Sequence, residues 1–348
     1  MSPLRIAQVA PLFESVPPKL YGGTERVVSY LTEELVRQGH EVTLFASGDS
    51  ITQAKLIAPC ERALRLDDRV VDHMSRHILM LELLARRASA FDIVHSHIDY
   101  LPFPVYRRLS IPTVTTLHGR LDLPELADIF AEFSDAPVVS ISMSQRQPLP
   151  QAHWVGNVDH GLPDDLYTFH PKAGEYLAFL GRISPEKRVD SAISLAIAEN
   201  LPLKISAKID QVDATYFETV IKPMLDHPLI EFLGEIGDSE KDGFLGNALA
   251  LLFPIDWPEP FGLVMVEALA CGTPILARCR GSVPEIMESG TTGFVYETEA
   301  EGQSALRNIR AIDRRACRKA FEQRFTARIM AQNYLEIYRA LLESPPNA

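Results

Sequence analysis

The stretch Pro258-Glu259-Pro260-Phe261-Gly262-Leu263-Val264-Met265-Val266-Glu267 predicts an extended loop that turns directly into a helix. Because Pro260 disfavours the α conformation for the residue before it, Glu259 belongs to the loop. Gly262 lets the backbone approach a ligand closely, and the helix is predicted to run from Leu263 to Ala270. The stretch therefore places two carboxylates, eight positions apart, on either side of a loop-to-helix junction.

The start of this helix is predicted to bind an anion. The N–H groups of Phe261, Gly262 and Leu263 have no partners within the helix, and a helix N-terminus attracts negative charge. Glu267 lies about one turn further in. This arrangement suits a ligand that carries both hydroxyls and phosphates, such as a nucleotide sugar. A surface turn followed by an ordinary capped helix would produce the same ten residues.

Two downstream motifs, Gly272-Thr273-Pro274 and Gly281-Ser282-Val283-Pro284-Glu285, strengthen the functional interpretation. Together with them, the stretch resembles the E-x7-E signature of the family 4 retaining glycosyltransferases, which have the GT-B fold. The resemblance spans nearly the whole chain, and its specific motifs are concentrated in residues 181 to 295. One departure is His160-Gly161, where many members of the family read Asn-Gly.

Composition limits the class of protein. The chain has 348 residues, enough for two domains, and 46% of them are hydrophobic, as in a soluble globular protein. Its formal net charge of −12 argues against general affinity for nucleic acid or anionic membranes. The N-terminal residues lack a signal peptide, and no apolar run approaches the roughly 20 residues of a membrane span. A reducing cytoplasm is expected, because no C-x-x-C pair or metal-binding spacing occurs among Cys60, Cys271, Cys279 and Cys317.

Short apolar runs alternate with helical periods, which predicts an α/β protein with parallel sheets and helices on both faces. The strands expected in the first half are 6–10, 42–46, 92–95, 113–117 and 138–142. Those expected in the second half are 177–180, 203–207, 230–233, 249–253, 274–277 and 293–296. We therefore expect two doubly wound, Rossmann-like domains, an acceptor-side domain over residues 1–168 and a donor-side domain over 169–325. The resemblance implies that they face a central cleft and that a helix within 326–348 packs back on the first domain.

Glycines and cations are predicted to hold the donor phosphates. Gly22 and Gly23 precede a helix that Thr24 can cap, and they resemble the family's glycine loop, although Gly-Gly before a helix is usually only a turn. Arg182 is expected to end a strand, with Lys187 in the first turn of the next helix. A cation there opposes the helix dipole unless an anion is bound nearby. Because the sequence has no Asp-x-Asp motif, these two cations are expected to replace a metal ion, whereas a plain surface Arg and Lys would be the alternative.

The reacting centre is predicted from His118, Glu259 and Glu267. His118 follows the strand 113–117, where a polar side chain at the carboxyl end faces the binding site; a structural histidine is the alternative. The resemblance places His118 beside the transferred sugar, assigns Glu259 to the sugar hydroxyls and makes Glu267 the ribose ligand. It also implies attack on the same face as the departing phosphate, because no residue stands out as a nucleophile. A glycoside hydrolase would also use two carboxylates, but the phosphate-binding residues argue against one.

Several residues receive supporting roles. His97 and Asp99 follow the strand 92–95 and are expected on the acceptor side; no further ligand cluster supports a metal there. The resemblance implies that the main chain at Gly234 and Ile236 contacts the nucleotide base. The helix 74–87 could dock weakly on a membrane, although packing into the core is the commoner use of such a helix.

These observations predict a cytoplasmic, metal-independent, retaining hexosyltransferase. Its partners would be a nucleotide-diphosphate sugar and a hydroxyl acceptor, whether a glycan, a lipid-linked sugar or a small molecule, with no cofactor and no nucleic acid. A nucleotide-sugar epimerase of the same fold is one alternative. A non-catalytic protein that binds a nucleotide sugar is another, although such a protein could have lost any of the four residues Arg182, Lys187, Glu259 and Glu267.

Overall fold

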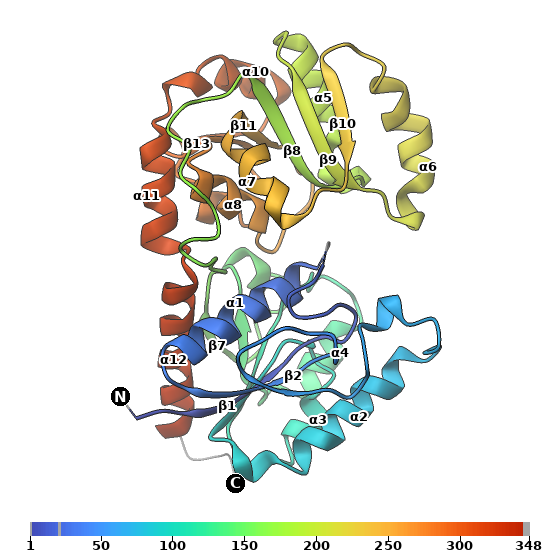
Figure 1. The fold of residues 1–348 in the computed structure, drawn as a ribbon, viewed down its shortest axis with the longest axis vertical. Helices are drawn as coiled ribbons and strands as arrows, with labels where there is room; N and C mark the ends of the chain where they lie inside the picture. Colours follow the sequence, from blue (N-terminus) through green and yellow to red (C-terminus); the bar gives the residue numbers. More distant parts are fainter. Residues whose placement is uncertain (1, 20–21, 344–348) are drawn as a thin grey trace. The chain divides into compact units, whose positions relative to one another are not determined.

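The computed structural model describes residues 2–19 and 22–343 and divides the chain into two compact units (Figure 1). Unit 1 comprises Met1–Pro163 together with Ala327–Ala348, and unit 2 comprises Asp164–Thr326. Each unit contains one parallel sheet with helices packed against it. The last residues of the predicted C-terminal segment, 344–348, lie outside the described part of the chain.

The division between the units falls five residues before the expected position of 168/169. Arg318 explains the difference, because its guanidinium donates to the main-chain oxygens of Asp164 and Tyr167 at 3.1 and 3.0 Å and ties this segment to unit 2. The chain returns to unit 1 between Thr326 and Ala327. There, the Ala327 N–H donates to the Leu162 main-chain oxygen at 2.7 Å, and both residues belong to unit 1.

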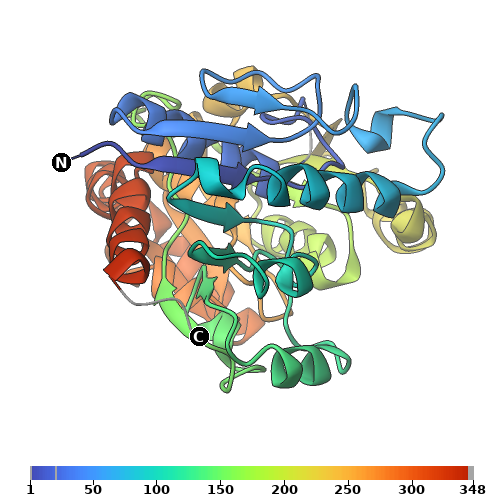
Figure 2. The same cartoon turned by 90° about the horizontal axis from the view of Figure 1, so that it is seen from below.

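Unit 1 holds a parallel sheet of seven strands in the order β3-β2-β1-β4-β5-β6-β7, in which β1 and β2 lie side by side (Figure 2). The strands are β1 Arg5–Val9, β2 Glu41–Phe45, β3 Lys55–Ile57, β4 Ile93–Ser96, β5 Thr113–Thr116, β6 Val138–Ser140 and β7 Trp154–Asn157. The helices are α1 Gly23–Arg37, α2 His73–Ala85, α3 Phe103–Tyr106, α4 Leu126–Glu132 and α12 Ala327–Glu343. The sequence did not predict β3 and β7, which are edge strands of three and four residues.

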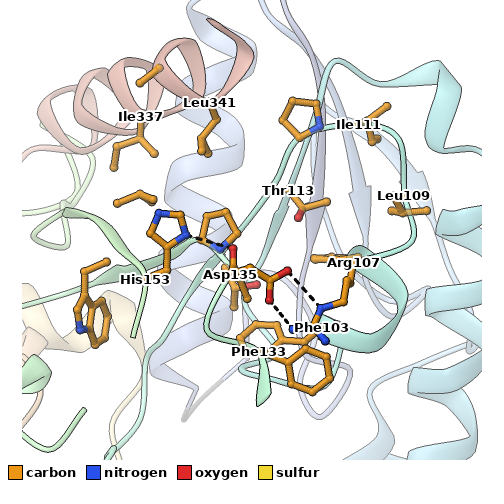
Figure 3. A pocket seen from close by; sticks show the side chains of 18 residues that line it. Phe103, Arg107, Leu109, Ile111, Thr113, Phe133, Asp135, His153, Ile337 and Leu341 are labelled. Carbon is orange, nitrogen blue, oxygen red and sulfur yellow. Dashed lines mark hydrogen bonds and ion pairs between the residues drawn. The ribbon is translucent and has the colours of Figure 1, made fainter. Parts of the chain in front are cut away.

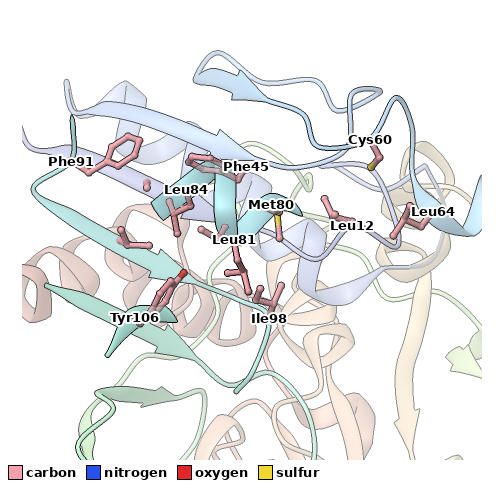
Figure 4. Packing of buried hydrophobic residues seen from close by; sticks show 13 residues of the cluster. Leu12, Phe45, Cys60, Leu64, Met80, Leu81, Leu84, Phe91, Ile98 and Tyr106 are labelled. Atoms are coloured by element: carbon pink, nitrogen blue, oxygen red, sulfur yellow. The ribbon is translucent and has the colours of Figure 1, made fainter. Parts of the chain in front are cut away.

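Alternate residues of the strands cover the two faces of this sheet, as the period of two requires. Phe45 packs with Met80 and Leu84 of α2 in one buried cluster (Figure 4). Its neighbour Leu44 packs with Val28 of α1 in another. The helix α12 packs beside α1, so the C-terminal helix belongs to the same side of the sheet as α1.

One detail of the helices in unit 1 differs from the prediction. Thr24 does not cap α1, because the helix already begins at Gly23, with Gly22 as its N-cap and the Arg26 N–H bonded to the Gly22 oxygen at 3.2 Å. In α2, Leu81 and Leu84 are buried. The side chains of Val71, Met74, Ile78 and Leu79, on and just before this helix, are exposed. Within the described residues, we find no helix that is both long and apolar enough to cross a membrane.

Unit 2 holds a parallel sheet of six strands in the order β10-β9-β8-β11-β12-β13. The strands are β8 Tyr176–Arg182, β9 Leu203–Lys208, β10 Ile230–Gly234, β11 Ala248–Phe253, β12 Ile275–Arg278 and β13 Gly293–Tyr296. The helices are α5 Val189–Ala198, α6 Ala214–Tyr216, α7 Asp238–Gly246, α8 Leu263–Cys271, α9 Val283–Ile286, α10 Glu299–Arg307 and α11 Arg314–Arg324. All six strands were predicted within two residues at each end.

The position of Lys187 requires a correction. It lies in a 3-10 turn, Pro185–Lys187, and not in the first turn of α5, which begins at Val189. The intervening Arg188 has a left-handed backbone with φ of 54°, which separates the two helical segments. Lys187 is therefore held in the loop after β8, two residues before α5 begins.

Candidate active site

In unit 2, the loop after β8 and the loop after β11 meet where the Asp256 N–H donates to the Glu186 main-chain oxygen at 2.9 Å. The two loops carry two bonded groups, Arg182 with Glu186 and Lys187 with Trp257 and Glu259, and we call these five side chains the charged cluster. The two loops follow the carboxyl ends of adjacent parallel strands, which is where open α/β sheets bind ligands. This cluster brings together three of the residues that the sequence predicted for the site.

Glu259 is held by two donors on one oxygen. Its Oε2 accepts from Lys187 Nζ at 2.5 Å and from Trp257 Nε1 at 2.7 Å. The Lys187 and Glu259 side chains are 20% and 15% exposed, so solvent screens this pair only partly. The sequence predicted separate roles for the two residues, the cation for phosphate and the carboxylate for sugar, and did not predict that they are in contact.

The backbone of the Glu259 loop is supported by the segment Gly281-Ser282. The Ser282 N–H donates to the Glu259 oxygen at 3.1 Å, and Ser282 Oγ donates to the Phe261 oxygen at 2.6 Å. Gly281 has a φ of 55°, and a Cβ atom there would lie 2.4 Å from the Glu259 nitrogen. Only glycine fits this position, which gives the downstream glycine motif a physical reason.

The helix α8 begins as predicted, directly after this loop. Gly262 is its N-cap with a left-handed φ of 82°, and Leu263 is its first residue. A helix of nine residues with this start leaves N–H groups at its N-terminus that can bind an anion. The sequence thus predicted the geometry of Gly262 and Leu263 correctly, next to Phe261 in the same loop.

Glu267 lies in α8 and is 3% exposed. Its Oε1 accepts from Tyr167 Oη at 3.1 Å and from Lys241 Nζ at 3.1 Å. Two donors on one oxygen fix the carboxylate and compensate for its burial.

Arg182 ends β8, as predicted, and is surrounded by acidic side chains. Its guanidinium lies 2.5 Å from Glu186, 3.6 Å from Asp210 and 3.5 Å from Asp213. The sequence did not predict these partners, which come from the loops after β8 and β9. They fix the cation at the carboxyl edge of the sheet.

In unit 1, four histidines lie at the carboxyl ends of three strands. We call them the histidine cluster: His95, His97, His118 and His160. His97 Nδ1 lies 2.8 Å from His118 Nε2, and the His118 ring stacks on that of His160 with centroids 5.2 Å apart. Burial lowers the pKa of His118 to about 3 and the pKa values of the other three well below the usual range, so the rings are neutral near pH 7.

His97 and Asp99, the predicted acceptor-side residues, both adjoin His118. Both ring nitrogens of His97 bond to protein groups, with Nε2 lying 2.8 Å from Gln8 Oε1. His97 can therefore act by positioning His118 but has no ring nitrogen left for a ligand. The Asp99 carboxylate interacts with the backbone N–H of His118, and Asp99 itself is exposed with a left-handed φ of 49°.

The two halves of the chain each match a glycosyltransferase family model. Residues 21–151 match the model described as Glycosyltransferase Family 4, and residues 168–326 match Glycosyl transferases group 1. The chain belongs to the family 4 glycosyltransferases. Its fold class is accordingly GT-B, with two Rossmann-like domains.

Individual relatives and solved structures are similar to this chain over most of its length. The chain is 24% identical to phosphatidyl-myo-inositol mannosyltransferase of Mycolicibacterium smegmatis, over 87% of this chain and 83% of the relative. Sucrose-phosphate synthase of Thermosynechococcus elongatus has a similar structure, with a TM-score of 0.79, 18% identity and coverage of 97% and 99%. HepE of Anabaena, solved in complex with UDP-glucose, has a TM-score of 0.70, 16% identity and coverage of 97% and 100%.

The remaining predicted residues of the glycosyltransferase also lie at carboxyl edges of the sheets. Gly22 and Gly23 start α1 in unit 1, and a Cβ atom on Gly23 would meet no atom within 4 Å, which leaves its backbone open. Gly234 ends β10 with a φ of 73°, and Ile236 follows it, half-buried. The main-chain oxygen of Gly234 already accepts from Ser206 Oγ at 3.0 Å.

One pocket lies away from all these residues. It has a volume of about 590 Å³ and lies in unit 1 against the starts of β5, β6 and β7 (Figure 3). Arg107 bonds to Glu132 and Asp135 at its wall. No predicted site residue lines this pocket, which is at the opposite end of the strands from His118.

Proposed function

We propose that this glycosyltransferase moves a hexosyl-type sugar from a nucleotide-diphosphate sugar to an acceptor hydroxyl, with retention of configuration and without a metal ion. The observation that carries the proposal is the charged cluster beside the start of α8. There, Lys187 and the helix N–H groups offer positive charge, while Glu259 offers hydrogen-bond acceptors, at the same sheet edge. A ligand that fits must carry phosphates and hydroxyls close together.

The departing diphosphate needs stabilisation as the glycosidic bond breaks. We assign this to Arg182, Lys187 and the N-terminus of α8, because preorganised donors stabilise charge that develops in the transition state. These groups take the place that a divalent cation fills in metal-dependent transferases. Within the described residues, no group of three or more His, Cys, Asp or Glu side chains is arranged to hold a metal ion. Our proposal of a metal-free reaction depends on the cations and not on that absence.

The sugar and nucleoside are assigned to the carboxylates. Glu259 would accept hydrogen bonds from the sugar hydroxyls and Glu267 from the ribose, with the base against the main chain at Gly234 and Ile236. The assignment of hexosyl chemistry rests on relatives, since one is named a mannosyltransferase and another was solved with UDP-glucose. His118 would contact the sugar and the acceptor as a neutral ring.

We assign retention from the resemblance to the retaining family 4 transferases. We then assign attack on the same face as the departing phosphate, because Glu259 Oε2 is already held by Lys187 and Trp257 and no other side chain stands out as a nucleophile. In the step that we propose, the bond from the anomeric carbon to the diphosphate oxygen breaks. A bond to the acceptor oxygen forms on the same face. The acceptor proton passes to the departing phosphate oxygen, so that charge and atoms balance without a further base.

Two features bear on where the enzyme works. The four cysteines are free thiols, which suits a reducing cytoplasm. The exposed apolar side chains of Val71, Met74 and Ile78 could support weak association with a membrane that carries a lipid-linked acceptor. Both assignments belong to the proposal, and vesicle co-sedimentation of the wild type against Ile78→Ser tests the second.

Thermal shift with UDP, GDP and ADP, each in the presence of EDTA, tests the proposal. We expect one nucleoside diphosphate to raise Tm, because binding to the folded state stabilises it by RT ln(1 + [L]/Kd). The Lys187→Ala variant should lose most of this shift, and Lys204→Ala, which removes the Lys204–Glu231 ion pair, should keep it. Stabilisation that requires a divalent metal would overturn the assignment of the cations.

Turnover of the matching nucleotide sugar then separates the enzyme classes. A transferase releases nucleotide diphosphate faster when a hydroxyl acceptor is added, and the new glycoside keeps the anomeric configuration of the donor. Release that is independent of any acceptor, with an altered sugar as product, would identify an epimerase. Binding without any turnover across a panel of acceptors would indicate a non-catalytic protein.

A further inference from the structure

A continuous path of hydrogen bonds joins the C-terminal helix α12 to His118 within unit 1. Tyr338 Oη lies 3.2 Å from Gln8 Nε2, and Gln8 Oε1 lies 2.8 Å from His97 Nε2. His97 Nδ1 lies 2.8 Å from His118 Nε2. We call these four residues, Tyr338, Gln8, His97 and His118, the histidine relay.

Three of the four residues of the relay are buried away from water. Gln8, His97 and Tyr338 are 0%, 2% and 0% exposed. Buried polar groups of this kind must satisfy one another, because an unpaired donor or acceptor costs about 1–3 kcal/mol. The proton positions along the relay are therefore linked, and each residue constrains the next.

The Gln8 amide sets the direction of these protons. Its nitrogen faces Tyr338 Oη and, at 3.5 Å, His95 Nδ1, so its oxygen faces His97 Nε2. An amide oxygen only accepts hydrogen bonds, so His97 Nε2 must carry the proton. A neutral His97 then accepts on Nδ1, and His118 must donate to it from Nε2.

We propose that Gln8 and Tyr338 are positioning residues that hold His118 in the tautomer protonated on Nε2, so that its Nδ1 lone pair is free to accept a hydrogen bond from a sugar or acceptor hydroxyl. His118 Nδ1 is buried and has no hydrogen-bond partner among the described residues, so a hydroxyl that reaches it would supply the missing partner. The other branch of the path fits this direction, because Tyr338 Oη can donate to His95 Nδ1 at 2.7 Å while it accepts from Gln8.

This inference rests on the proposed function for the identity of the ligand, but the tautomer itself can be measured without any substrate. It also gives α12 a part in the site. Tyr338 lies 330 residues after Gln8 in the chain, yet its hydroxyl orients the amide that sets the protons. A neutral lone pair at Nδ1 would also suit a transition state in which the sugar gains positive character.

The decisive measurement is a ¹H–¹⁵N NMR spectrum of the full-length protein labelled on histidine, at pH 7.5 without ligand. The His118→Gln variant identifies the His118 signals. We expect His118 with Nε2 protonated and Nδ1 unprotonated, and the same pattern for His97. A proton on His118 Nδ1 would reverse the whole relay and overturn the inference, whatever the enzyme's activity.

Variants extend the test. Gln8→Leu removes the acceptor for His97, so we expect His118 to show a mixture of tautomers. We also expect kcat to fall about 10- to 100-fold with little change in donor KM, the range known for partners that orient metal-bound histidines. Gln8→Glu keeps an oxygen towards His97 and should retain the tautomer. If Gln8→Leu does not fold, Tyr338→Phe provides the same comparison with its packing intact.

Tyr106→Phe is the matched control, because it also deletes a buried phenol hydroxyl of unit 1 but lies outside the relay. It should change neither the tautomer nor kcat. Normal kcat in Gln8→Leu despite a mixed tautomer would remove the relay from the reaction. If no nucleotide sugar is turned over by the wild type, the proposed function fails, while the tautomer measured by NMR still decides the relay.

Discussion

The charged cluster of unit 2 and the histidine cluster of unit 1 are built in opposite ways. Glu259, Lys187, Arg182 and Glu186 are ionised side chains that remain 15–31% exposed and hold one another by charge. His95, His97 and His160 are neutral rings that are 0–5% exposed, and hydrogen bonds fix His95 and His97. Ion pairs depend little on orientation, so they suit the binding and release of a diphosphate. Hydrogen bonds are directional, so they suit a side chain such as His97 that must keep one orientation throughout the reaction.

The largest effect is expected from the charged cluster. Glu259→Ala should lower kcat by about 10²–10³, the scale of one preorganised contact that the transition state uses. Steady-state kinetics with the donor identified by thermal shift would measure it. Removal of Glu259 also frees Lys187, so donor binding should weaken far less than turnover.

The control for this variant is Glu231→Ala, which breaks the exposed ion pair with Lys204 on the same sheet. It should change kcat by less than twofold, since exposed pairs contribute little. Unchanged kinetics in Glu259→Ala would take this carboxylate out of the mechanism. The carboxylate of the charged cluster in unit 2 would then have no part in catalysis.

The parts of the molecule that the sequence predicted well are those with local patterns. The strands of unit 2 are apolar runs of four to seven residues, and periodicity alone located them. The edge strands β3 and β7 escaped because each holds only two apolar residues, whereas every strand of unit 2 holds at least three. Proline and glycine rules likewise located the loop and start of α8, since those residues restrict their own neighbours.

The parts that the sequence did not predict depend on partners distant in the chain. Glu259 and Lys187 were predicted, but not their contact across 72 positions. Gln8 and Tyr338 were missed altogether, because periodicity does not show which buried polar groups satisfy each other. One signal was available: Gln8 and His95 are polar residues inside apolar strands, and a buried polar side chain requires a partner.

A smaller effect is expected from a residue that supports the charged cluster without touching a ligand. Gly281→Ala would place a methyl group 2.4 Å from the Glu259 nitrogen at a left-handed φ of 55°. We expect a loss of about 1–3 kcal/mol in unfolding free energy from the strained backbone. We also expect a drop in kcat of about tenfold, because the displaced carboxylate no longer fits the transition state.

Denaturant unfolding and kinetics together test this variant against Gly243→Ala. Gly243 lies within α7, where a Cβ atom would meet only Asn247 Nδ2 at 3.9 Å, so alanine should be tolerated or stabilising there. A Gly281→Ala enzyme with normal kcat would show that Glu259 works from a loop that can shift. That outcome would contradict a preorganised charged cluster.

The smallest effect per residue is expected from the histidine cluster, as a dependence of stability on pH. Burial lowers the pKa of His160 well below its ordinary value near 6.5, so the unfolded chain binds a proton that the folded chain refuses. Stability is therefore fully present above pH 6.5 and is lost as the pH falls below it. Between pH 7.5 and 6.0 this amounts to about 0.8 kcal/mol for one such histidine.

His160→Asn isolates this contribution, because the change removes one buried ring and keeps a polar side chain. Urea unfolding at pH 7.5 and 6.0 should show a smaller loss of stability on acidification in the variant than in the wild type, by about 0.8 kcal/mol. His153→Asn, at an exposed histidine of the same unit, should leave the difference unchanged. If His160→Asn and the wild type lose the same free energy on acidification, His160 is protonated in the folded state, and the histidine cluster is charged and closer in kind to the cluster of unit 2.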